Sequence, residues 1–391
     1  MPVPEYWLLI LISSCAATMH FRVLDRGDKW SLGRRALAGF FVGGLIAASV
    51  GPVRSLLAHG QLMLSWAVLI GVPIVSAIVL IRSRFELALA IVTGLLLSGL
   101  MRHSPPVVQE GRSQYGVVEV RDQNGRRLLI NGNTLHGEQE LGCALGAHIS
   151  SCSEPTGYYD RQGPLGLAVQ TVRRRIGRMS VGVIGLGAGG IATYCESGDH
   201  MTFIEVDPLV LAVAERSFTY LKNARSKCGA VSVTIGDGRL RLRERPRRSF
   251  DFIVADAFSS DAIPIHLLTR EAIAEFVSTV TSEGIVAFHL SNRHLDLSPV
   301  VVTGGTANHM SALALRDSGD KTTGRRETWW VFLGGSEQLA ELRRAVAGTD
   351  NPASFHEAGP AEAAVAVWLD ESHSILSVWP PAWTPTHWFS R

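Results

Sequence analysis

The sequence predicts a bundle of membrane-spanning helices followed by a doubly wound α/β domain. Three observations support this prediction. The apolar residues are concentrated before residue 103, apolar strand-like segments alternate with helical ones beyond residue 115, and a glycine-rich turn directly follows one of those strands. Such alternation is typical of a parallel sheet that is covered by helices on both faces.

The N-terminal region contains four apolar stretches. Of the 391 residues 46% are hydrophobic and only 18% are charged, which is apolar for a soluble protein. A helix needs roughly 20 apolar residues to cross a bilayer; the third stretch reaches that length, whereas the first is short. A signal peptide is the alternative for the first stretch, but no basic residue precedes it. We predict about four transmembrane helices within residues 1–102, at 6–19, 36–50, 62–81 and 87–101.

The rest of the chain divides into four segments. Residues 103–114 contain Ser-Pro-Pro and are expected to form a linker. Residues 115–140 form a β-hairpin module, because strand-like segments flank Asn124-Gly125, a strong two-residue turn signal. We place the α/β domain at 141–345 and a C-terminal extension at 346–391. Within the α/β domain we expect helices at 165–176, 209–221 and 269–281, and strands at 181–184, 231–235, 250–255, 284–290 and 328–333.

A nucleotide-binding βαβ unit spans residues 180–207. Gly185, Gly187 and Gly190 fit G-x-G-x-x-G after an apolar strand, and Glu205 follows Gly185 by twenty residues. The domain is therefore expected to be Rossmann-like. Glycine at these positions lets a ligand approach the backbone and the following helix N-terminus.

Acidic residues end three successive strands of the predicted sheet. Glu205, Asp237 and Asp256 should converge on the crevice at the carboxyl ends of the strands. A dinucleotide dehydrogenase is one alternative, since the glycine pattern alone is a weak discriminator. Asp237 suits an adenine amino group, and Asp256 is placed to meet a positively charged sulfonium or amine. This arrangement favours a class I S-adenosylmethionine-dependent transferase.

The segment from about Tyr115 to Leu333 resembles the spermidine synthase (polyamine aminopropyltransferase) family, and within it the membrane-fused bacterial branch. The resemblance rests on blocks of residues that occur in order along the chain. They are 131–132, 134–139, Tyr158-Tyr159, 163–166, 185–190, 205–208, 236–238, and the two most specific, 256–264 and 289–293.

The resemblance implies attack by an amine on a carbon next to the sulfonium of S-adenosylmethionine or its decarboxylated form, with release of 5'-methylthioadenosine. Asp256 would be the base, Asp261 the amine anchor and Tyr159 an orienting hydroxyl. Glu205 would hold the ribose and Asp237 the adenine amino group. The other expected contacts to the adenosyl compound come from His136, Gln139, Gly185, Gly187, Gly189, Gly238 and Ala257.

Structural roles are the alternatives for several of these residues. Asp256 could cap a helix, Asp261 could be a turn residue before Pro264, and Tyr159 could be a core aromatic. His136 could satisfy a hydrogen bond within the hairpin. For Asp207, before Pro208, we expect a helix cap rather than a ligand contact.

One departure from the family bears on the acceptor. Soluble spermidine synthases carry an acid within the glycine block, where this chain has Ala188. A buried ammonium without a counter-charge is costly, so an acceptor other than putrescine stays open. Two alternatives keep the same fold: a lyase or cyclase that acts on S-adenosylmethionine without an acceptor, and a non-catalytic sensor of adenosyl ligands. The hairpin and the 256–264 loop argue against a methyltransferase.

Composition and residue spacing indicate few further partners. The net charge is +2 and the arginine runs lack interleaved aromatics, so we expect no nucleic acid. The histidines show no ligand spacing, so we expect no metal. Among the five cysteines Cys143 and Cys152 could pair, but without a disulfide framework we expect free, partly buried thiols. The lipid bilayer and a second copy of the chain are the remaining expected partners.

Two arguments about the side of the membrane oppose each other. Residues 22–35 carry five Lys or Arg, and with Arg82 and Arg84 they would lie in the cytoplasm by the positive-inside rule. An even number of spans then places the α/β domain outside. Adenosyl cofactors are made in the cytosol, however, and on that ground we expect a multi-pass protein of the bacterial inner membrane with a cytoplasmic α/β domain.

Overall fold

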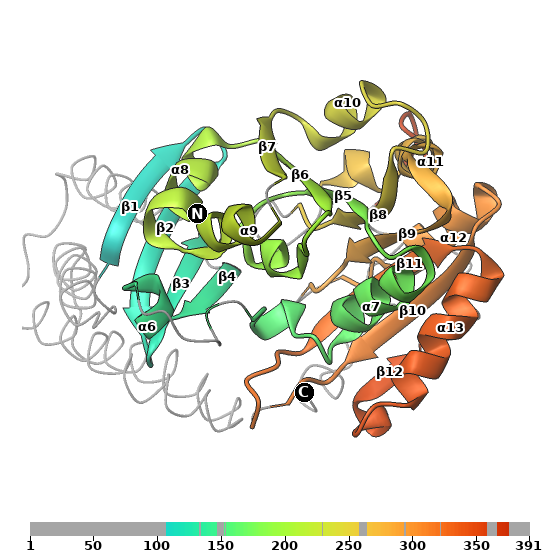
Figure 1. Ribbon diagram of the computed structural model, residues 1–391. Helices are drawn as coiled ribbons and strands as arrows, with labels where there is room; N and C mark the ends of the chain where they lie inside the picture. The colour runs from blue at the N-terminus through green and yellow to red at the C-terminus, as the bar shows by residue number, and fades with distance from the viewer. Residues whose placement is uncertain are drawn as a thin grey trace, which may run out of the picture. The chain divides into compact units, whose positions relative to one another are not determined.

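The computed structural model (Figure 1) describes the part of the chain that follows the predicted membrane region. The transmembrane helices expected within residues 1–102 lie outside the described residues. Among the residues that are described, no helix combines the length and apolar character needed to cross a bilayer. The described ranges are 107–132, 134–146, 152, 154–228, 230–257, 264–292, 295–320, 322–357 and 366–374.

A four-stranded antiparallel sheet precedes the α/β domain. Its strands are consecutive in space: β1 (Val107–Ser113), β2 (Gly116–Gln123), β3 (Arg126–Asn131) and β4 (Thr134–Glu140). Asn124 and Gly125 have φ values of 51° and 74°, so the predicted two-residue turn joins β2 to β3. β1 occupies residues that the sequence analysis gave to the linker, because it pairs with β2 along its length. The hairpin module is therefore larger than predicted.

The main sheet has eight strands in the order β12-β10-β11-β9-β8-β5-β6-β7. The chain runs outward from β5 through β6 to β7, then returns to β8 on the other side of β5. The sheet therefore has a topological switch point between β5 and β8, where α/β proteins bind ligands at the carboxyl ends of the strands. The parallel strands are β5 (Ser180–Ile184), β6 (His200–Glu205), β7 (Val231–Ile235), β8 (Phe250–Ala255) and β9 (Val280–His289). The antiparallel strands are β11 (Thr328–Gly334), β10 (Ser311–Asp317) and β12 (Phe355–Glu357).

Two helical layers cover the two faces of this sheet. Because side chains alternate along a strand, Phe252 and Val254 of β8 face one layer while Ile253 and Ala255 face the other. Figure 1 shows α7 and α13 beside one another in the first layer. The first layer contains α7 (Pro164–Ile176), α8 (Pro208–Ser217), α9 (Tyr220–Cys228) and α13 (Ser336–Ala347), and the second contains α10 (Gly238–Arg243), α11 (Arg270–Thr279) and α12 (Ser298–Ala307).

The predicted helix at 209–221 is two helices. Phe218 has extended backbone angles (φ −127°, ψ 159°), so α8 ends before it and α9 begins at Tyr220. The helix cap predicted for Asp207 is confirmed, because its carboxylate accepts the Leu209 N–H at 2.9 Å. Short elements complete the fold: α6 (Leu141–Ala144) and the 3₁₀ helices η3 (Gly157–Tyr159), η4 (Gly190–Tyr194), η5 (Ile265–Leu267) and η6 (Pro352–Ser354).

Two disulfides correct the expectation of free thiols. Cys143 pairs with Cys152 and Cys195 pairs with Cys228, at sequence separations of 9 and 33 residues. The second bridge ties the residue after η4 to the end of α9, which is a contact between elements that the sequence does not place together. Each bridge restricts the unfolded chain, and the longer loop gives the larger restriction.

We expect the Cys195→Ser/Cys228→Ser double variant to lose about 3–4 kcal/mol of unfolding free energy, and the Cys143→Ser/Cys152→Ser variant about 2–3 kcal/mol, from loop-closure entropy. Guanidinium unfolding of the full-length chain under oxidising conditions measures both values. With reducing agent the wild-type chain should lose stability, whereas the variants lose only what their remaining bridge contributes. A wild-type chain equally stable with and without reducing agent would contradict the pairing.

Candidate active site

A cavity of about 270 Å³ lies between the carboxyl ends of the parallel strands and the four-stranded sheet. Val118 and Leu129 line it from the smaller sheet, and Ile184 and Ile204 line it from the larger one. Four acids reach its wall: Glu205, Asp207, Asp237 and Asp256. The cavity is thus apolar on its flanks and acidic at the strand ends, which suits a ligand that carries both a flat ring and a positive charge.

Asp256 directly follows β8 and is held by two side chains. Its Oδ2 accepts the Tyr159 hydroxyl at 2.6 Å, and its Oδ1 lies 2.6 Å from Nδ1 of His289. The Asp256 side chain is 9% exposed. Its position at the end of β8 places it on the cavity wall.

Tyr159 is fixed by its own backbone and by burial. It ends η3, and its carbonyl oxygen accepts the Tyr194 hydroxyl at 2.5 Å. Burial, with a smaller contribution from the Asp256 carboxylate, raises the pKa of Tyr159 well above its usual value. The phenol therefore stays protonated and donates to Asp256.

His289 is a site residue to which the sequence analysis gave no role. It ends β9, lines the cavity and is 3% exposed. Its Nε2 lies 2.8 Å from Ser291 Oγ and 3.0 Å from Thr328 Oγ1. The available signal was its place at the carboxyl end of the strand next to β8, where a side chain points towards the same crevice.

Glu205 ends β6, and its carboxylate already binds the glycine turn. Oε2 accepts the Leu186 N–H and Oε1 accepts the Asp207 N–H, both at 2.9 Å. Burial raises the pKa of Glu205, and the two amide hydrogen bonds oppose that rise. An ionised carboxylate has about four lone-pair sites, so Glu205 can accept a hydroxyl donor from a ligand beside these amides.

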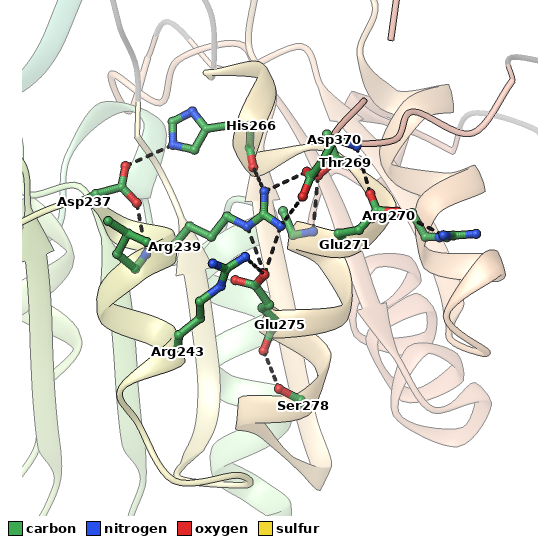
Figure 2. Close-up of polar contacts among 12 residues, drawn as sticks. Asp237, Arg239, Arg243, His266, Thr269, Arg270, Glu271, Glu275, Ser278 and Asp370 are labelled. Atoms are coloured by element: carbon green, nitrogen blue, oxygen red, sulfur yellow. Dashed lines mark hydrogen bonds and ion pairs between the residues drawn. The ribbon is translucent and has the colours of Figure 1, made fainter. Parts of the chain in front are cut away.

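Asp237 follows β7 and caps α10. Its Oδ1 accepts the Leu240 N–H at 3.0 Å, and its Oδ2 lies 3.1 Å from Nε2 of His266 (Figure 2). Gly238 is adjacent and also lines the cavity. An acid at this strand end was predicted, but its contact with His266 was not.

The glycine turn brings backbone segments of the protein together. A Cβ on Gly185 would collide with the Asp256 carbonyl, and a Cβ on Gly187 would collide with the His136 carbonyl. Both glycines have positive φ and line the cavity, whereas Gly189 packs near Leu221 and is not among the lining residues. At Gly185 and Gly187 the contact with a neighbouring backbone carbonyl is by itself enough to require glycine.

The two site residues predicted on β4, His136 and Gln139, lie in different environments. His136 lines the cavity, as expected. Gln139 is buried elsewhere: its amide donates to Thr219 Oγ1 at 2.7 Å and accepts the Thr219 N–H at 3.0 Å. Gln139 is therefore not among the residues that line the cavity, and it holds β4 against the residue that precedes α9.

Two further predicted residues follow β8. Ala257 lines the cavity beside Asp256. Asp261 lies outside the described residues, so its expected role as amine anchor stays a prediction. Across the described ranges no group of three or more His, Cys, Asp or Glu could hold a metal ion.

Ala188 fills the place where an acid was noted in soluble family members. It is 2% exposed, and the backbone of Gly137 packs directly on its methyl group. A Cβ on Gly137 would collide with that methyl group. The absence of a side chain at Gly137 therefore lets β4 pack on the glycine turn.

A buried arginine, Arg239, connects the part of the cavity wall around Asp237 and His266 to the C-terminal segment (Figure 2). Arg239 binds the Asp370 carboxylate through two nitrogens, each at 2.7 Å, and its Nε donates to Glu275 at 3.0 Å. It also donates to the His266 carbonyl at 3.2 Å. His266 and Gly238 both line the cavity. Arg239 follows Gly238 and binds the His266 carbonyl, so it holds these two parts of the cavity wall together.

Comparison with known proteins gives one sequence relative and several distant structures. A polyamine aminopropyltransferase from Vibrio vulnificus (strain CMCP6) is 34% identical over 111 residues, which cover 27% of this chain and 35% of that protein. Over that segment the chain is similar to the polyamine aminopropyltransferases. The resemblance to the polyamine aminopropyltransferases is thereby confirmed over that segment, which spans about a third of the relative's length. No protein-family model matches the chain.

Two solved structures are similar at low identity. A probable spermidine synthase from Corynebacterium glutamicum ATCC 13032 has a TM-score of 0.45 at 15% identity, covering 64% of this chain and 91% of that one. Spermidine synthase from Thermotoga maritima has a TM-score of 0.43 at 12% identity, covering 73% and 87%. These scores lie under 0.5, so the fold assignment rests on the strand order itself.

We expect Asp370→Asn to lower the melting temperature at pH 7. The Arg239 guanidinium, helped by the Thr269 hydroxyl, holds the pKa of Asp370 at about 2, below its usual 3.8. A charged hydrogen bond contributes about 1.5–3 kcal/mol, which we discount to about 1 kcal/mol because the Asp370 side chain is 41% exposed. That corresponds to about 2–4 °C.

The pH dependence follows from the sign of this shift. A carboxylate whose pKa is depressed on folding stabilises the fold above its unfolded pKa of about 3.9, and this stabilisation is lost as pH falls through about 2. The difference between wild type and Asp370→Asn should be constant from pH 8 to 5 and shrink below pH 4. Calorimetry over a pH series measures it, with Glu357→Gln, which removes a half-exposed pair with Arg343, as the control. A difference that is as large at pH 3 as at pH 7 would reject the assignment.

Proposed function

We propose that the protein is a membrane-anchored, spermidine-synthase-like transferase that moves an aminopropyl-type group from decarboxylated S-adenosylmethionine to an amine. The observation that supports this best is the Asp256 carboxylate, which faces the cavity at the switch point and receives one donor on each oxygen. The 34% identity to a polyamine aminopropyltransferase over 111 residues agrees with it. The other product would be 5'-methylthioadenosine.

The cavity residues fit an adenosyl sulfonium. Glu205 offers two carboxylate oxygens with remaining lone pairs for the ribose hydroxyls, and Asp237 offers the same to an adenine amino group. Between them the apolar side chains of Ile204 and Val206 line the wall, where a flat ring would lie. The sulfonium makes the adjacent carbon electrophilic and leaves as a neutral thioether.

The chain's own contribution is to hold the amine and take its proton. An ammonium has no free electron pair, so the acceptor must lose a proton before or during attack. Asp256 is the carboxylate placed to receive that proton, and Tyr159, protonated and buried, fixes its Oδ2. The enclosing walls from β2, β3 and β4 limit access of water, so the reacting atoms stay aligned.

We expect Asp256→Asn to reduce methylthioadenosine release by about 10²–10⁴-fold, the usual contribution of a general base. Binding of the adenosyl compound should persist, because Glu205 and Asp237 remain in place. The assay incubates purified full-length protein with S-adenosylmethionine or its decarboxylated form and a panel of amines, and follows products by mass spectrometry. Asp350→Asn, at an exposed surface carboxylate, is the matched control.

The same assay separates the alternative reaction. Release of methylthioadenosine without any added amine would indicate a lyase or cyclase that acts on the adenosyl compound alone. Tight binding without turnover in every condition would indicate a ligand sensor. Unchanged turnover in Asp256→Asn would remove the base assignment.

The compartment of the α/β domain is a separate proposal. Disulfides persist in oxidising compartments and are rare in the cytosol, and the structure pairs four cysteines. The positive loop charges before residue 85 favour the same side. We therefore propose that the α/β domain lies outside the cytoplasmic membrane, which reverses the cytoplasmic expectation and requires the adenosyl substrate to be present there.

We expect a membrane-impermeant amine reagent to label Lys222 and Lys227, which are exposed on α9, in intact spheroplasts that express the full-length chain. Thiols are trapped with an alkylating agent before lysis, and the peptides that contain Cys195 and Cys228 are then examined without reduction. They should remain joined. Alkylated cysteines together with lysines that label only after lysis would place the domain in the cytoplasm.

A further inference from the structure

His289 is held more rigidly than a residue that merely lines a cavity. Its ring stacks on Trp330 with centroids 4.4 Å apart and planes 9° from parallel. Trp330 stands opposite His289 in the register of β11 and β9, and it is 1% exposed. The Tyr158 ring lies 5.5 Å away on a tilted approach. These contacts fix the plane of the imidazole and therefore the direction of both of its nitrogens.

The hydrogen bonds around the ring define one tautomer. A base must be ionised before it takes a proton, and an ionised carboxylate can only accept. Nδ1 must therefore carry the proton that is shared with Asp256 Oδ1 at 2.6 Å. In the neutral ring Nε2 is then the acceptor, and it has two hydroxyl neighbours, Ser291 and Thr328.

The hydroxyls are arranged to donate to Nε2. The Trp329 N–H donates to Ser291 Oγ at 3.0 Å, which uses an acceptor position of that hydroxyl and leaves its proton to be donated. Thr328 Oγ1 lies 3.2 Å from Ser291 Oγ, so the two hydroxyls share their protons between each other and Nε2. With Nε2 as the acceptor, the donors along the chain Trp329, Ser291, His289 and Asp256 all point towards the carboxylate.

We infer that His289 is a positioning residue for the reaction: its imidazole donates Nδ1–H to Asp256 and fixes the carboxylate against Tyr159, so that a remaining lone pair of Asp256 faces the incoming amine. This inference rests on the proposed function. It assigns to His289 the task that an aspartate performs for a catalytic histidine in hydrolase triads, with the two residue types exchanged.

The test compares three variants of His289 that differ in the position of the hydrogen-bond donor. His289→Asn keeps a nitrogen donor at the position of Nδ1, His289→Gln moves the donor to the position of Nε2, and His289→Leu has no donor. We expect His289→Asn to retain turnover within about tenfold of wild type. His289→Gln and His289→Leu should lose about 10²-fold or more in kcat, while the KM for the adenosyl substrate changes less than threefold.

Controls separate positioning from folding. His356→Asn, on the exposed strand β12, should leave kcat and the melting temperature unchanged. A purely structural role for His289 predicts that all three variants lose stability and substrate binding together, without rescue by Asn. That result, or a His289→Leu variant with wild-type kcat, would overturn the inference.

A second readout does not depend on turnover. Nitrogen NMR of histidine-labelled protein should show His289 as a neutral ring protonated on Nδ1, and Asp256→Ala should change that signal because the proton loses its acceptor. If wild type releases no methylthioadenosine with any amine, the proposed function fails, and this spectrum still decides the contact. A ring protonated on Nε2, or a spectrum unaffected by Asp256→Ala, would refute the placement.

Discussion

The cavity depends on two close backbone approaches, at Gly185 and Gly187, that a side chain would block. Each glycine lies against a carbonyl of another segment: Asp256 after β8 in one case and His136 in β4 in the other. Because no Cβ intervenes, the end of β8 closes onto the end of β5, and the smaller sheet closes onto the turn. The cavity is the space that these two approaches leave between them. A side chain at either position would displace Asp256 or the opposite wall of the cavity.

The acids of the cavity are oriented by donors from the protein before a ligand arrives. Glu205 holds two backbone N–H groups, Asp237 holds one together with His266, and Asp256 holds a phenol and an imidazole. Polar groups fixed in advance do not have to reorganise when charge moves during a reaction. Ala188 adds no further acid to the cavity: its side chain is a buried methyl group against which Gly137 packs.

The sequence predicted those parts of the structure that depend on residues close together along the chain. The strands β5 to β8 and the acids that follow them were predicted, because apolar runs and the residues that end them are local signals. Gln139 was misplaced because its partner Thr219 comes from a distant segment: Gln139 stands opposite Arg127, farther along β4 than His136, and Thr219 binds its amide. α12 was missed because Ser298–Ala307 contains β-branched residues and glycines, and it is helical through packing against β10 and β11. His289 and the Cys195–Cys228 bridge depend on partners from distant segments, which no local pattern reports.

The segment 366–374 carries a practical consequence for work with this chain. Trp368 is 2% exposed within the core layer that contains α11 and α12, and its carbonyl accepts the Arg270 N–H at 2.7 Å. A truncation that stops at Glu357 would therefore leave a cavity beneath α11 and remove the Asp370 partner of the buried Arg239 guanidinium. Affinity handles and reporter fusions that need a trimmed end should leave this stretch intact, although little in its local sequence distinguishes it from a dispensable tail.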